Sequence, residues 1–236
     1  MPAWYVAGSS RVWVIIVHGY GTTREEGIRP MPVLRRLGFP ILDISYRNDS
    51  GSPLSPDHLY HLGATEWKDL QAAVRYALSR GAKGVILYGY SMGGGIVEDF
   101  MHHSSNSIKV RAVVLDSPAL DWYSILDLAA EQRDLPLPFA SLVEKVVAWR
   151  LGMSSLDAVD QSKQTSGPTP PVLVFHGLDD TTVPITSSDT WVHHYPGTAV
   201  YYRVPRADHT QSWNVNPSSY DAKLEAFLKR WGGTQS

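Results

Sequence analysis

Six short runs of apolar, mostly β-branched residues limit most strongly how this chain of 236 residues can fold. They cover residues 11–17, 40–46, 84–88, 111–115, 172–175 and 199–204. Each run has the length and composition of a buried strand. Patterns with helical spacing lie between the runs, most clearly over residues 64–80, where Trp67, Leu70 and Val74 recur on one face. Because strands that alternate with helices favour a parallel sheet covered on both faces, we predict an α/β fold with a mostly parallel, six-stranded sheet.

The composition and charge narrow the class of partner. Hydrophobic residues make up 43% of the chain and charged residues 19%, as is typical of a folded globular protein. A formal net charge of -2 argues against nucleic acid or an anionic membrane as a partner. The chain has no cysteine, so disulfides, thiolate metal sites and a cysteine nucleophile are excluded. We therefore expect a small-molecule substrate.

The location of the protein is predicted from two absences in the sequence. The first residues lack the basic start and the apolar stretch of a signal peptide. No later apolar run approaches the roughly 18 residues that span a bilayer. We expect a cytoplasmic protein that does not bind a membrane.

One connection between the strand runs is unusually long. About fifty residues separate the fourth run from the fifth, whereas a crossover between parallel strands needs about a dozen. The excess contains "FASLVEKVVAWRL", whose apolar residues form a helical stripe, after the helix-breaking "LPLP". The stripe consists of Phe139, Leu142, Val143, Val146, Val147 and Leu151. We predict a single domain over residues 1–236 with a small helical cap inserted at about 117–165; the alternative is an ordinary pair of core helices.

A glycine-rich segment follows the third strand run directly. "GYSMGGG" has the pattern G-x-S-x-G between a strand and a helix, the context in which this pattern marks a nucleophile elbow. Ser91 must occupy a strained turn to expose its hydroxyl group, and Gly89 and Gly93 lack side chains where strand and helix nearly touch. We predict that Ser91 is a nucleophile; the alternative is a structural turn with an idle serine.

A serine nucleophile needs a base, and the base needs an acid that orients it. In a parallel sheet such groups gather after the carboxyl ends of strands. "RADHTQSW" follows the last run and supplies His209 as the general base. "HGLDDTTVP" follows the fifth run and supplies two adjacent candidates for the acid, Asp179 and Asp180. Serine, acid and histidine thus follow the chain order of the α/β-hydrolases.

The other histidines have less specific surroundings. His18 and His176 each precede a glycine at a strand end, where a turn-shaping role is expected. His58 and His61 follow Asp57 at a spacing that is compatible with a metal site. Because no further ligand is placed by the sequence, we interpret that segment as a solvated loop and expect no metal.

Acyl transfer also requires backbone donors for the developing oxyanion. The N–H of Met92, directly after the nucleophile, is the first candidate. The second is the N–H of Tyr20 in "HGYGTTRE", because Gly19 and Gly21 allow the backbone to turn a donor inward. The alternative is a plain glycine turn after a strand.

Together these segments resemble a known family. "VHGYG", "GYSMGG", "HGLDDTTVP" and "ADHTQSW" are similar to the successive motifs of the α/β-hydrolase superfamily, in its small serine esterase, lipase and peptidase-like branch. The resemblance implies a catalytic triad of Ser91, Asp180 and His209, an oxyanion hole from Tyr20 and Met92, and no cofactor. It favours Asp180 over Asp179, since the acid occupies the fifth position of the motif that begins H-G. Asp116 in "VVLDSP" is a further rival, because some members place the acid there.

The chain departs from the superfamily at its beginning. The full fold usually has eight strands, two of them before the run that leads into the oxyanion loop, but only ten residues precede Arg11 here. We expect the N-terminal strands to be truncated, with a remnant around residues 4–6. An uncovered sheet edge invites pairing with another chain, so a homodimer is a hypothesis.

The resemblance and the length of the chain favour one reaction. A gating propeller domain, as in large peptidases of the superfamily, does not fit in 236 residues, and the cap is too small for a long-chain lipase lid. We predict a serine carboxylesterase for short to medium acyl chains that acts through an acyl-enzyme. The alternatives are a small peptidase or amidase, a thioesterase, and a non-catalytic hydrolase-like receptor. The candidate pocket wall consists of Leu120, Trp122, Ile125, Phe139 and Trp149.

Overall fold

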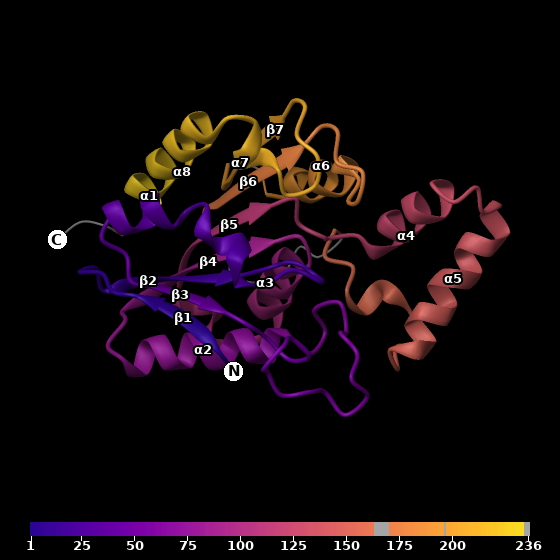
Figure 1. Ribbon diagram of the computed structural model, residues 1–236, viewed down its shortest axis with the longest axis horizontal. Helices are drawn as coiled ribbons and strands as arrows, with labels where there is room; N and C mark the ends of the chain where they lie inside the picture. Colours follow the sequence, from indigo (N-terminus) through magenta and orange to yellow (C-terminus); the bar gives the residue numbers. More distant parts are fainter. Residues whose placement is uncertain (163–169, 196, 234–236) are drawn as a thin grey trace.

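The sheet has seven strands and is parallel except at one edge. The computed structural model describes residues 1–162, 170–195 and 197–233. The strand order is β1-β3-β2-β4-β5-β6-β7, and only β1 runs antiparallel to its neighbour (Figure 1). The strands are β1 (Ala3–Val6), β2 (Val12–Val17), β3 (Ile41–Ile44), β4 (Gly84–Tyr90), β5 (Val110–Asp116), β6 (Val172–Gly177) and β7 (Ala199–Val204). The predicted α/β architecture with a mostly parallel sheet is confirmed.

The predicted number of six strands is one too low. The remnant around residues 4–6 forms β1, which pairs with β3 so that Ala3 faces Ile44 and Val6 faces Ile41. Sequence periodicity did not identify this strand, because four mostly exposed residues carry no pattern of burial. Backbone pairing with β3 is what makes it a strand, and the sheet therefore ends in a short edge of four residues.

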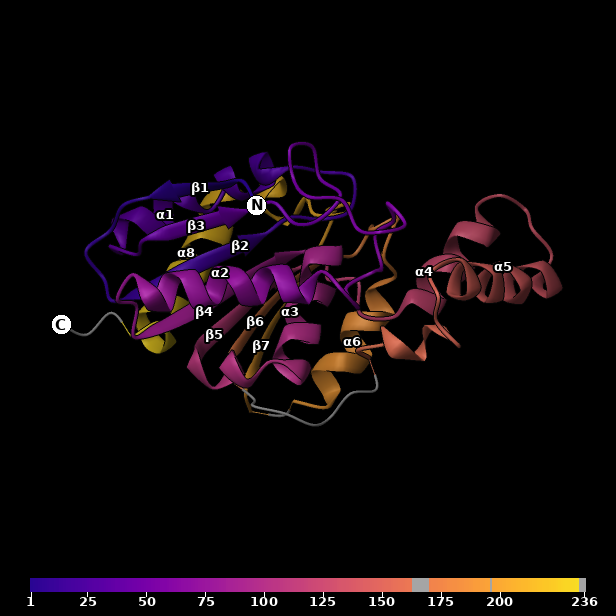
Figure 2. The same ribbon diagram turned by 90° about the horizontal axis from the view of Figure 1, so that it is seen from below.

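Helices cover both faces of the sheet, as predicted. Alternate residues of β2 point to opposite faces, so Ile15 joins one apolar core and Ile16 the other. The first core packs against α2 (Trp67–Ser79), α3 (Met92–His103) and α6 (Ile185–His193); the second packs against α1 (Met31–Arg36) and α8 (Pro217–Trp231). Figures 1 and 2 show these two layers on either side of the strands. The shorter helices are η1 (Arg24–Ile28), η2 (Ser105–Lys109), η3 (Leu156–Ala158) and α7 (Ser212–Val215).

The insertion between β5 and β6 extends beyond the carboxyl end of the sheet. It contains α4 (Trp122–Glu131), α5 (Leu137–Arg150) and η3, and α4 and α5 project away from the strands (Figure 2). Residues 163–165 of the predicted cap lie outside the described residues. Within the described part, no helix is long and apolar enough to cross a membrane. The cytoplasmic location and the extent of the cap stay predictions.

The apolar stripe predicted for the cap packs inward only in part. Ala140 and Ala148 are the buried residues of α5, whereas Phe139 and Leu142 are more than half exposed. Ala148 packs with Leu156 and other residues of the cap. Of the other stripe residues, Val143, Val147 and Leu151 are half-buried, and Val147 and Leu151 line a cavity. The stripe is therefore divided between the inner and the outer side of α5.

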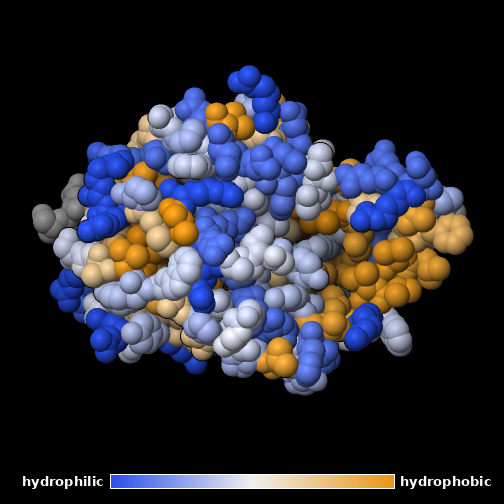
Figure 3. Space-filling view, viewed as in Figure 1, coloured by the Kyte–Doolittle hydropathy of each residue, from blue (hydrophilic) through white to orange (hydrophobic). Residues whose placement is uncertain are grey.

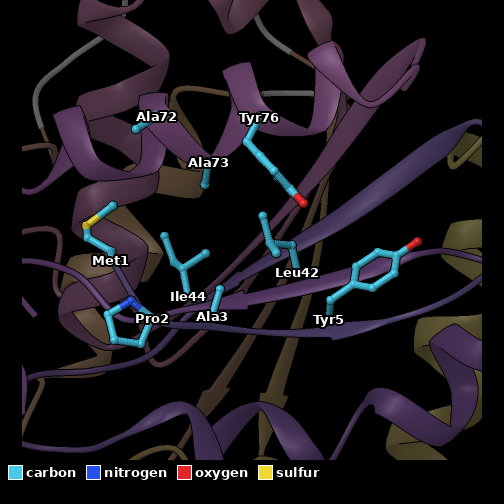
Figure 4. A pocket seen from close by; sticks show the side chains of 9 residues that line it. All are labelled: Met1, Pro2, Ala3, Tyr5, Leu42, Ile44, Ala72, Ala73 and Tyr76. Carbon is cyan, nitrogen blue, oxygen red and sulfur yellow. The ribbon is translucent and has the colours of Figure 1, made fainter. Parts of the chain in front are cut away.

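A hollow beside the edge strand lies apart from every predicted site residue. It has a volume of about 400 Å³ and is lined by side chains of β1, β3 and α2, among them Tyr5, Ile44 and Tyr76 (Figure 4). The lining contains neither a carboxylate nor a histidine. This hollow therefore offers no group for the predicted chemistry, and the candidate site must be sought at the other predicted residues.

Candidate active site

Ser91 occupies a sharp turn between β4 and α3. Its backbone has φ 48° and ψ -121°, a conformation that a non-glycine residue adopts only under constraint. A Cβ atom on Gly93 would lie 2.2 Å from the carbonyl oxygen of Val17, and one on Gly89 would lie 2.6 Å from that of Gly93. Both positions therefore exclude a side chain, for the steric reason expected from the sequence.

The structure brings His209 to Ser91 over a separation of 118 residues. Nε2 of His209 lies 2.8 Å from Oγ of Ser91. The histidine is in the loop after β7, and the next residue, Thr210, donates its N–H to Oγ of Ser117 at 3.1 Å. Arg29 also donates to the carbonyl oxygen of Thr210 at 2.5 Å. These contacts hold the loop so that the imidazole stays within hydrogen-bond distance of the serine.

Asp180, and not Asp179, contacts the imidazole. Nδ1 of His209 lies 2.9 Å from Oδ2 and 3.1 Å from Oδ1 of Asp180. Oδ1 also accepts the N–H groups of Thr182 and Val183, at 2.9 and 2.8 Å. Asp179 is exposed. The tautomer assigned from these contacts carries its proton on Nδ1, which leaves Nε2 free to accept a proton from Ser91.

Two histidines oppose the effect of burial on the pKa of Asp180. Burial by itself raises the pKa of this carboxyl group, but hydrogen bonds from His176 and His209 outweigh it. The pKa is therefore lowered below its ordinary value, and Asp180 is ionised at neutral pH. An ionised carboxylate in this position can stabilise the imidazolium that forms when His209 takes a proton.

His176 has a larger part in the site than the expected turn-shaping role. It is fully buried, and its Nε2 lies 3.0 Å from the carbonyl oxygen of Val183 and 3.3 Å from Oδ2 of Asp180. Because both neighbours are acceptors, Nε2 must carry a proton. Its Nδ1 lies 2.7 Å from the hydroxyl group of Ser188, which can donate to it. The only signal in the sequence was the spacing of four residues between His176 and Asp180.

Asp116, the rival acid, has other partners. Its two carboxylate oxygens accept hydrogen bonds from Ser212 and from the hydroxyl group of Tyr220, both at 2.9 Å. Burial raises its pKa to about 6, although these two hydrogen bonds oppose the rise. The contacts of Asp116 thus join the end of β5 to α7 and α8, and do not extend to the imidazole of His209.

Asp208, which the sequence interpretation overlooked, links the two loops that carry the acid and the base. Its Oδ1 accepts the N–H of Thr181 at 2.9 Å and the N–H of His209 at 2.8 Å. These backbone hydrogen bonds lower the pKa of Asp208. Its position directly before His209 was a signal in the sequence, but its partner lies 27 residues away in the chain.

The segment predicted to supply the oxyanion donors lies against Ser91. A Cβ atom on Gly19 would lie 3.0 Å from Cβ of Ser91. Glu26 accepts the N–H of Gly19 at 2.9 Å, and the hydroxyl group of Tyr46 donates to the carbonyl oxygen of Gly19 at 2.9 Å. Since the N–H and C=O of a trans peptide point in opposite directions, the N–H of Tyr20 points away from Tyr46.

Met92 is the other residue predicted to donate its N–H to the oxyanion, and several side chains around Tyr46 hold the segment that contains Tyr20 in place. Met92 begins α3, so its N–H has no acceptor within the helix. Burial, followed by the charge of Asp49, raises the pKa of Tyr46, which keeps its hydroxyl group protonated and able to donate. His18 stacks on Tyr46 with ring centroids 4.5 Å apart, and its Nε2 lies 2.9 Å from Oδ2 of Asp49. Glu26 and Tyr46 are thus positioning residues that the motifs did not reveal.

Ser91 and His209 open into a cavity of about 620 Å³ between the sheet and the cap. The cavity is lined by Tyr20, His58, Leu59, Tyr60, Leu62, Ser91, Ala119, Trp122, Ile125, Val146, Val147, Arg150, Leu151, Thr182, Val183 and His209. Trp122 and Ile125 line it, as expected from the sequence. The expectation was wrong for three residues: Leu120 is buried in the core, whereas Phe139 and Trp149 are 56% and 76% exposed.

The candidate metal-binding segment forms a local contact. Nε2 of His61 lies 3.1 Å from Oδ2 of Asp57, while His58 lines the cavity. No cluster of three or more His, Asp or Glu side chains with the arrangement of a metal site occurs in the described parts of the chain.

Solved structures of known proteins share the fold. An esterase of Pyrococcus furiosus is 23% identical, with a TM-score of 0.74 over 98% of this chain and 87% of that one. A monoacylglycerol lipase of Paleococcus ferrophilus is 18% identical, with a TM-score of 0.70 over 96% and 97%. Est1E of Butyrivibrio proteoclasticus, solved with ferulic acid bound, is 16% identical, with a TM-score of 0.71 over 98% and 94%. At these identities the likeness establishes the α/β-hydrolase fold.

The family is established by the sequence comparison. No curated protein matches the chain significantly. The profile of the prolyl oligopeptidase family matches residues 30–235, a stretch that includes Ser91, Asp180 and His209 but begins after the segment with Tyr20. Because this match covers most of the chain and the fold agrees with it, the chain is a serine hydrolase of the α/β-hydrolase superfamily and belongs to the prolyl oligopeptidase family.

Proposed function

We propose that the protein is a carboxylesterase that cleaves esters of short to medium acyl chain through an acyl-enzyme. One observation carries this proposal: Ser91, His209 and Asp180 form a continuous hydrogen-bonded chain that ends in a cavity of about 620 Å³. This size is ordinary for a small-molecule site. The triad and the two oxyanion donors predicted from the sequence are part of the proposal.

The two steps of the reaction follow from the contacts of His209. Oγ of Ser91 attacks the ester carbonyl carbon while Nε2 of His209 takes the serine proton, and Asp180 stabilises the resulting imidazolium. The N–H groups of Tyr20 and Met92 bind the oxyanion. The alcohol leaves with the proton from His209. Water, deprotonated by the same histidine, then attacks the acyl-enzyme and releases the acid.

The lining of the cavity supports an ester more than a peptide. An aminopeptidase needs an anionic group for the substrate's amino terminus, but Arg150 is the only formally charged side chain among the lining residues in the described part of the chain. The named activities of structural relatives point the same way, since these include an esterase and a monoacylglycerol lipase. The ferulic acid bound to Est1E suggests aromatic acyl groups as further substrates.

A small peptidase or amidase is the second candidate. The observation in its favour is the match to a family named after oligopeptidases. A thioesterase would use the same serine and histidine, because acyl transfer to Ser91 does not depend on which leaving group departs. A non-catalytic receptor would keep these residues but release product only once or very slowly.

A panel of substrates separates these functions. We expect turnover of p-nitrophenyl esters with acyl chains from acetate to octanoate, a decline for longer chains, and much slower cleavage of matched aminoacyl anilides. The Ser91→Ala variant should lose this turnover and is the control for background hydrolysis. Faster cleavage of the anilides would favour the peptidase, a preference for acyl thioesters the thioesterase, and a single stoichiometric release the receptor.

A further inference from the structure

Helix α5 carries four large apolar side chains on its outer surface. Phe139, Leu142, Val146 and Trp149 are 56%, 52%, 51% and 76% exposed. We call these four residues the outer stripe. In Figure 3 the surface around the cap shows a continuous hydrophobic area, in contrast with the mostly polar surface over the rest of that face. Contiguous exposed apolar patches of this kind mark interaction surfaces.

The spacing of the outer stripe is that of a helix that packs against another helix. Its residues follow one another at intervals of three, four and three, as at the a and d positions of a heptad. The buried residues Ala140 and Ala148 lie on the opposite side of α5. Phe139, Leu142 and Trp149 therefore point away from the body of the protein, where no described element covers them. Val146 lies at the border of the stripe and also lines the cavity that contains Ser91.

We propose that the outer stripe is the interface of a homodimer in which two α5 helices pack antiparallel about a twofold axis. The order of residues along the stripe is self-complementary, as such an axis requires. With the axis at the level of Glu144, Phe139 faces the partner's Trp149 and Leu142 faces the partner's Val146. Aromatic side chains meet at both ends and aliphatic ones in the middle.

The charges beside the stripe are compatible with this arrangement. Lys145 flanks the stripe, and the same axis brings it to the level of the partner's Val143, so the two lysines are not opposed. Glu144 lies away from the stripe, since its carboxyl group interacts with Asp127 of α4. The net charge of -2 per chain also gives only weak repulsion between copies.

The exposed area is large enough to be the centre of an interface. The four side chains expose on the order of 450 Å², more than half of the roughly 800 Å² that each partner contributes to a stable complex. The sheet edge is the weaker surface for dimerisation, because β1 offers only four residues for pairing. The homodimer expected from the sequence is thus reassigned from the sheet edge to the cap.

Dimerisation at α5 would stabilise one wall of the cavity that contains Ser91. Val146 of the stripe and its neighbour Val147 line the cavity that contains Ser91, as does Arg150 at the end of the helix. A second copy packed on the outer face would hold this wall in place. The interface and the substrate site therefore share one helix, and Val146 belongs to both.

Sedimentation equilibrium tests the interface directly. We expect the wild-type chain to form dimers at micromolar concentration, and Leu142→Glu and Trp149→Lys to weaken dimerisation at least tenfold. Ile108→Lys is the matched control, because Ile108 is 77% exposed but lies on η2. A chain that stays monomeric at high concentration, or a dimer unaffected by both stripe variants, would overturn the proposal.

Cysteine cross-linking tests the antiparallel direction. Because the chain has no native cysteine, only the introduced cysteines can form a disulfide. A mixture of Leu142→Cys and Val146→Cys should form a disulfide-linked dimer on oxidation, since these positions face each other. Either variant alone should not, because its two cysteines are about 6 Å out of register along the helices. Cross-linking of either variant alone that is at least as efficient as cross-linking of the mixture would overturn the antiparallel arrangement.

A lipid surface is the other occupant that an exposed apolar helix could have. Flotation with phosphatidylcholine vesicles distinguishes it. We expect the wild-type chain to remain unbound under the conditions in which it dimerises. Binding that is lost in Trp149→Lys and kept in Ile108→Lys would assign the stripe to lipid and overturn the proposal of a dimer.

Discussion

Nε2 of His176 lies 3.3 Å from Oδ2 of Asp180, the same oxygen atom that Nδ1 of His209 approaches at 2.9 Å. One carboxylate therefore accepts from two imidazoles, one buried and one at the cavity. Ser188 can donate to Nδ1 of His176, which leaves the proton of His176 on the side of Asp180. His176 thus orients the carboxylate of Asp180, and Asp180 in turn orients the imidazole of His209.

Replacement of His176 should impair turnover without abolishing it. His176→Phe keeps an aromatic ring but removes the donor to Asp180, so the carboxylate becomes freer to rotate and its pKa rises. We expect kcat to fall about tenfold, equivalent to one hydrogen bond of roughly 1.4 kcal/mol, with little change in KM. Steady-state kinetics with a p-nitrophenyl ester measures this. Ser188→Ala should have a smaller effect, and an unchanged kcat in His176→Phe would contradict the role.

The two neighbouring aspartates should differ sharply in their contribution. Asp180→Asn presents an amide to Nδ1 of His209 and destabilises the tautomer that accepts the serine proton. We expect a loss of about four orders of magnitude in kcat. Asp179 is exposed, so Asp179→Asn should keep nearly full activity and serves as the matched control. Measurement of both variants by the same ester assay decides the assignment, which fails if Asp179→Asn is the more damaged enzyme.

Glu26 should affect catalysis through the backbone that it holds. Glu26→Ala removes the acceptor of the Gly19 N–H and lets the Gly19–Tyr20 peptide turn. We expect kcat to fall roughly tenfold to a hundredfold, below the loss of a complete oxyanion donor, with KM little changed. Glu25→Ala is the control, because Glu25 is the exposed neighbour. A rise in KM at constant kcat would instead indicate a role in substrate binding.

Stability should decrease as the pH rises from about 5 to 8. Burial, with the charge of Asp99, raises the pKa of Glu98 from 4.5 to about 8. The folded state therefore keeps a proton in this window that the unfolded state has released, and its advantage is lost as the pH rises. The slope from this group is at most about 1.4 kcal/mol per pH unit. Urea unfolding at several pH values should show a flatter dependence for Glu98→Gln.

The control for this experiment is an exposed glutamate. Glu131→Gln at the end of α4 should keep the pH dependence of the wild-type chain. Asp99 also has a pKa raised to about 8 by burial, so part of the slope should remain in Glu98→Gln. Parallel curves for Glu98→Gln and the wild-type chain would show that Glu98 releases its proton equally easily in both states.

Local sterics and periodicity made much of the site predictable. Gly89 precedes Ser91 because a side chain there would meet Gly93 and Gly94, a constraint that acts within five residues of the chain. Gly93 was predictable from the pattern G-x-S-x-G, although the atom that excludes its side chain is the carbonyl oxygen of Val17 in β2. His209 follows from the rule that loops at the carboxyl ends of parallel strands converge. The choice of Asp180 needed the resemblance to a family, since its neighbour Asp179 has the same chemistry.

Contacts between distant segments were not predictable in the same way. Asp208 could be noted beside His209, but its bond to Thr181 depends on how two loops meet. The partner of Glu26 is a backbone N–H, which no side-chain pattern records. For α5 the periodicity showed that apolar residues share a face, and the packing of the cap decided which of them are exposed, as Phe139 and Leu142 are, and which line the cavity, as Val147 does.

The sequence by itself determined the order of strands and helices, the strained turn at Ser91 and the chemical types of the base and acid. These features depend on steric limits and alternation along a short stretch of chain, which can be read locally. Only the tertiary structure decided which oxygen His176 and His209 share, which residues hold the Gly19–Tyr20 peptide, and which side of the cap meets solvent. Each of these depends on how remote segments pack together, and local spacing does not record that packing.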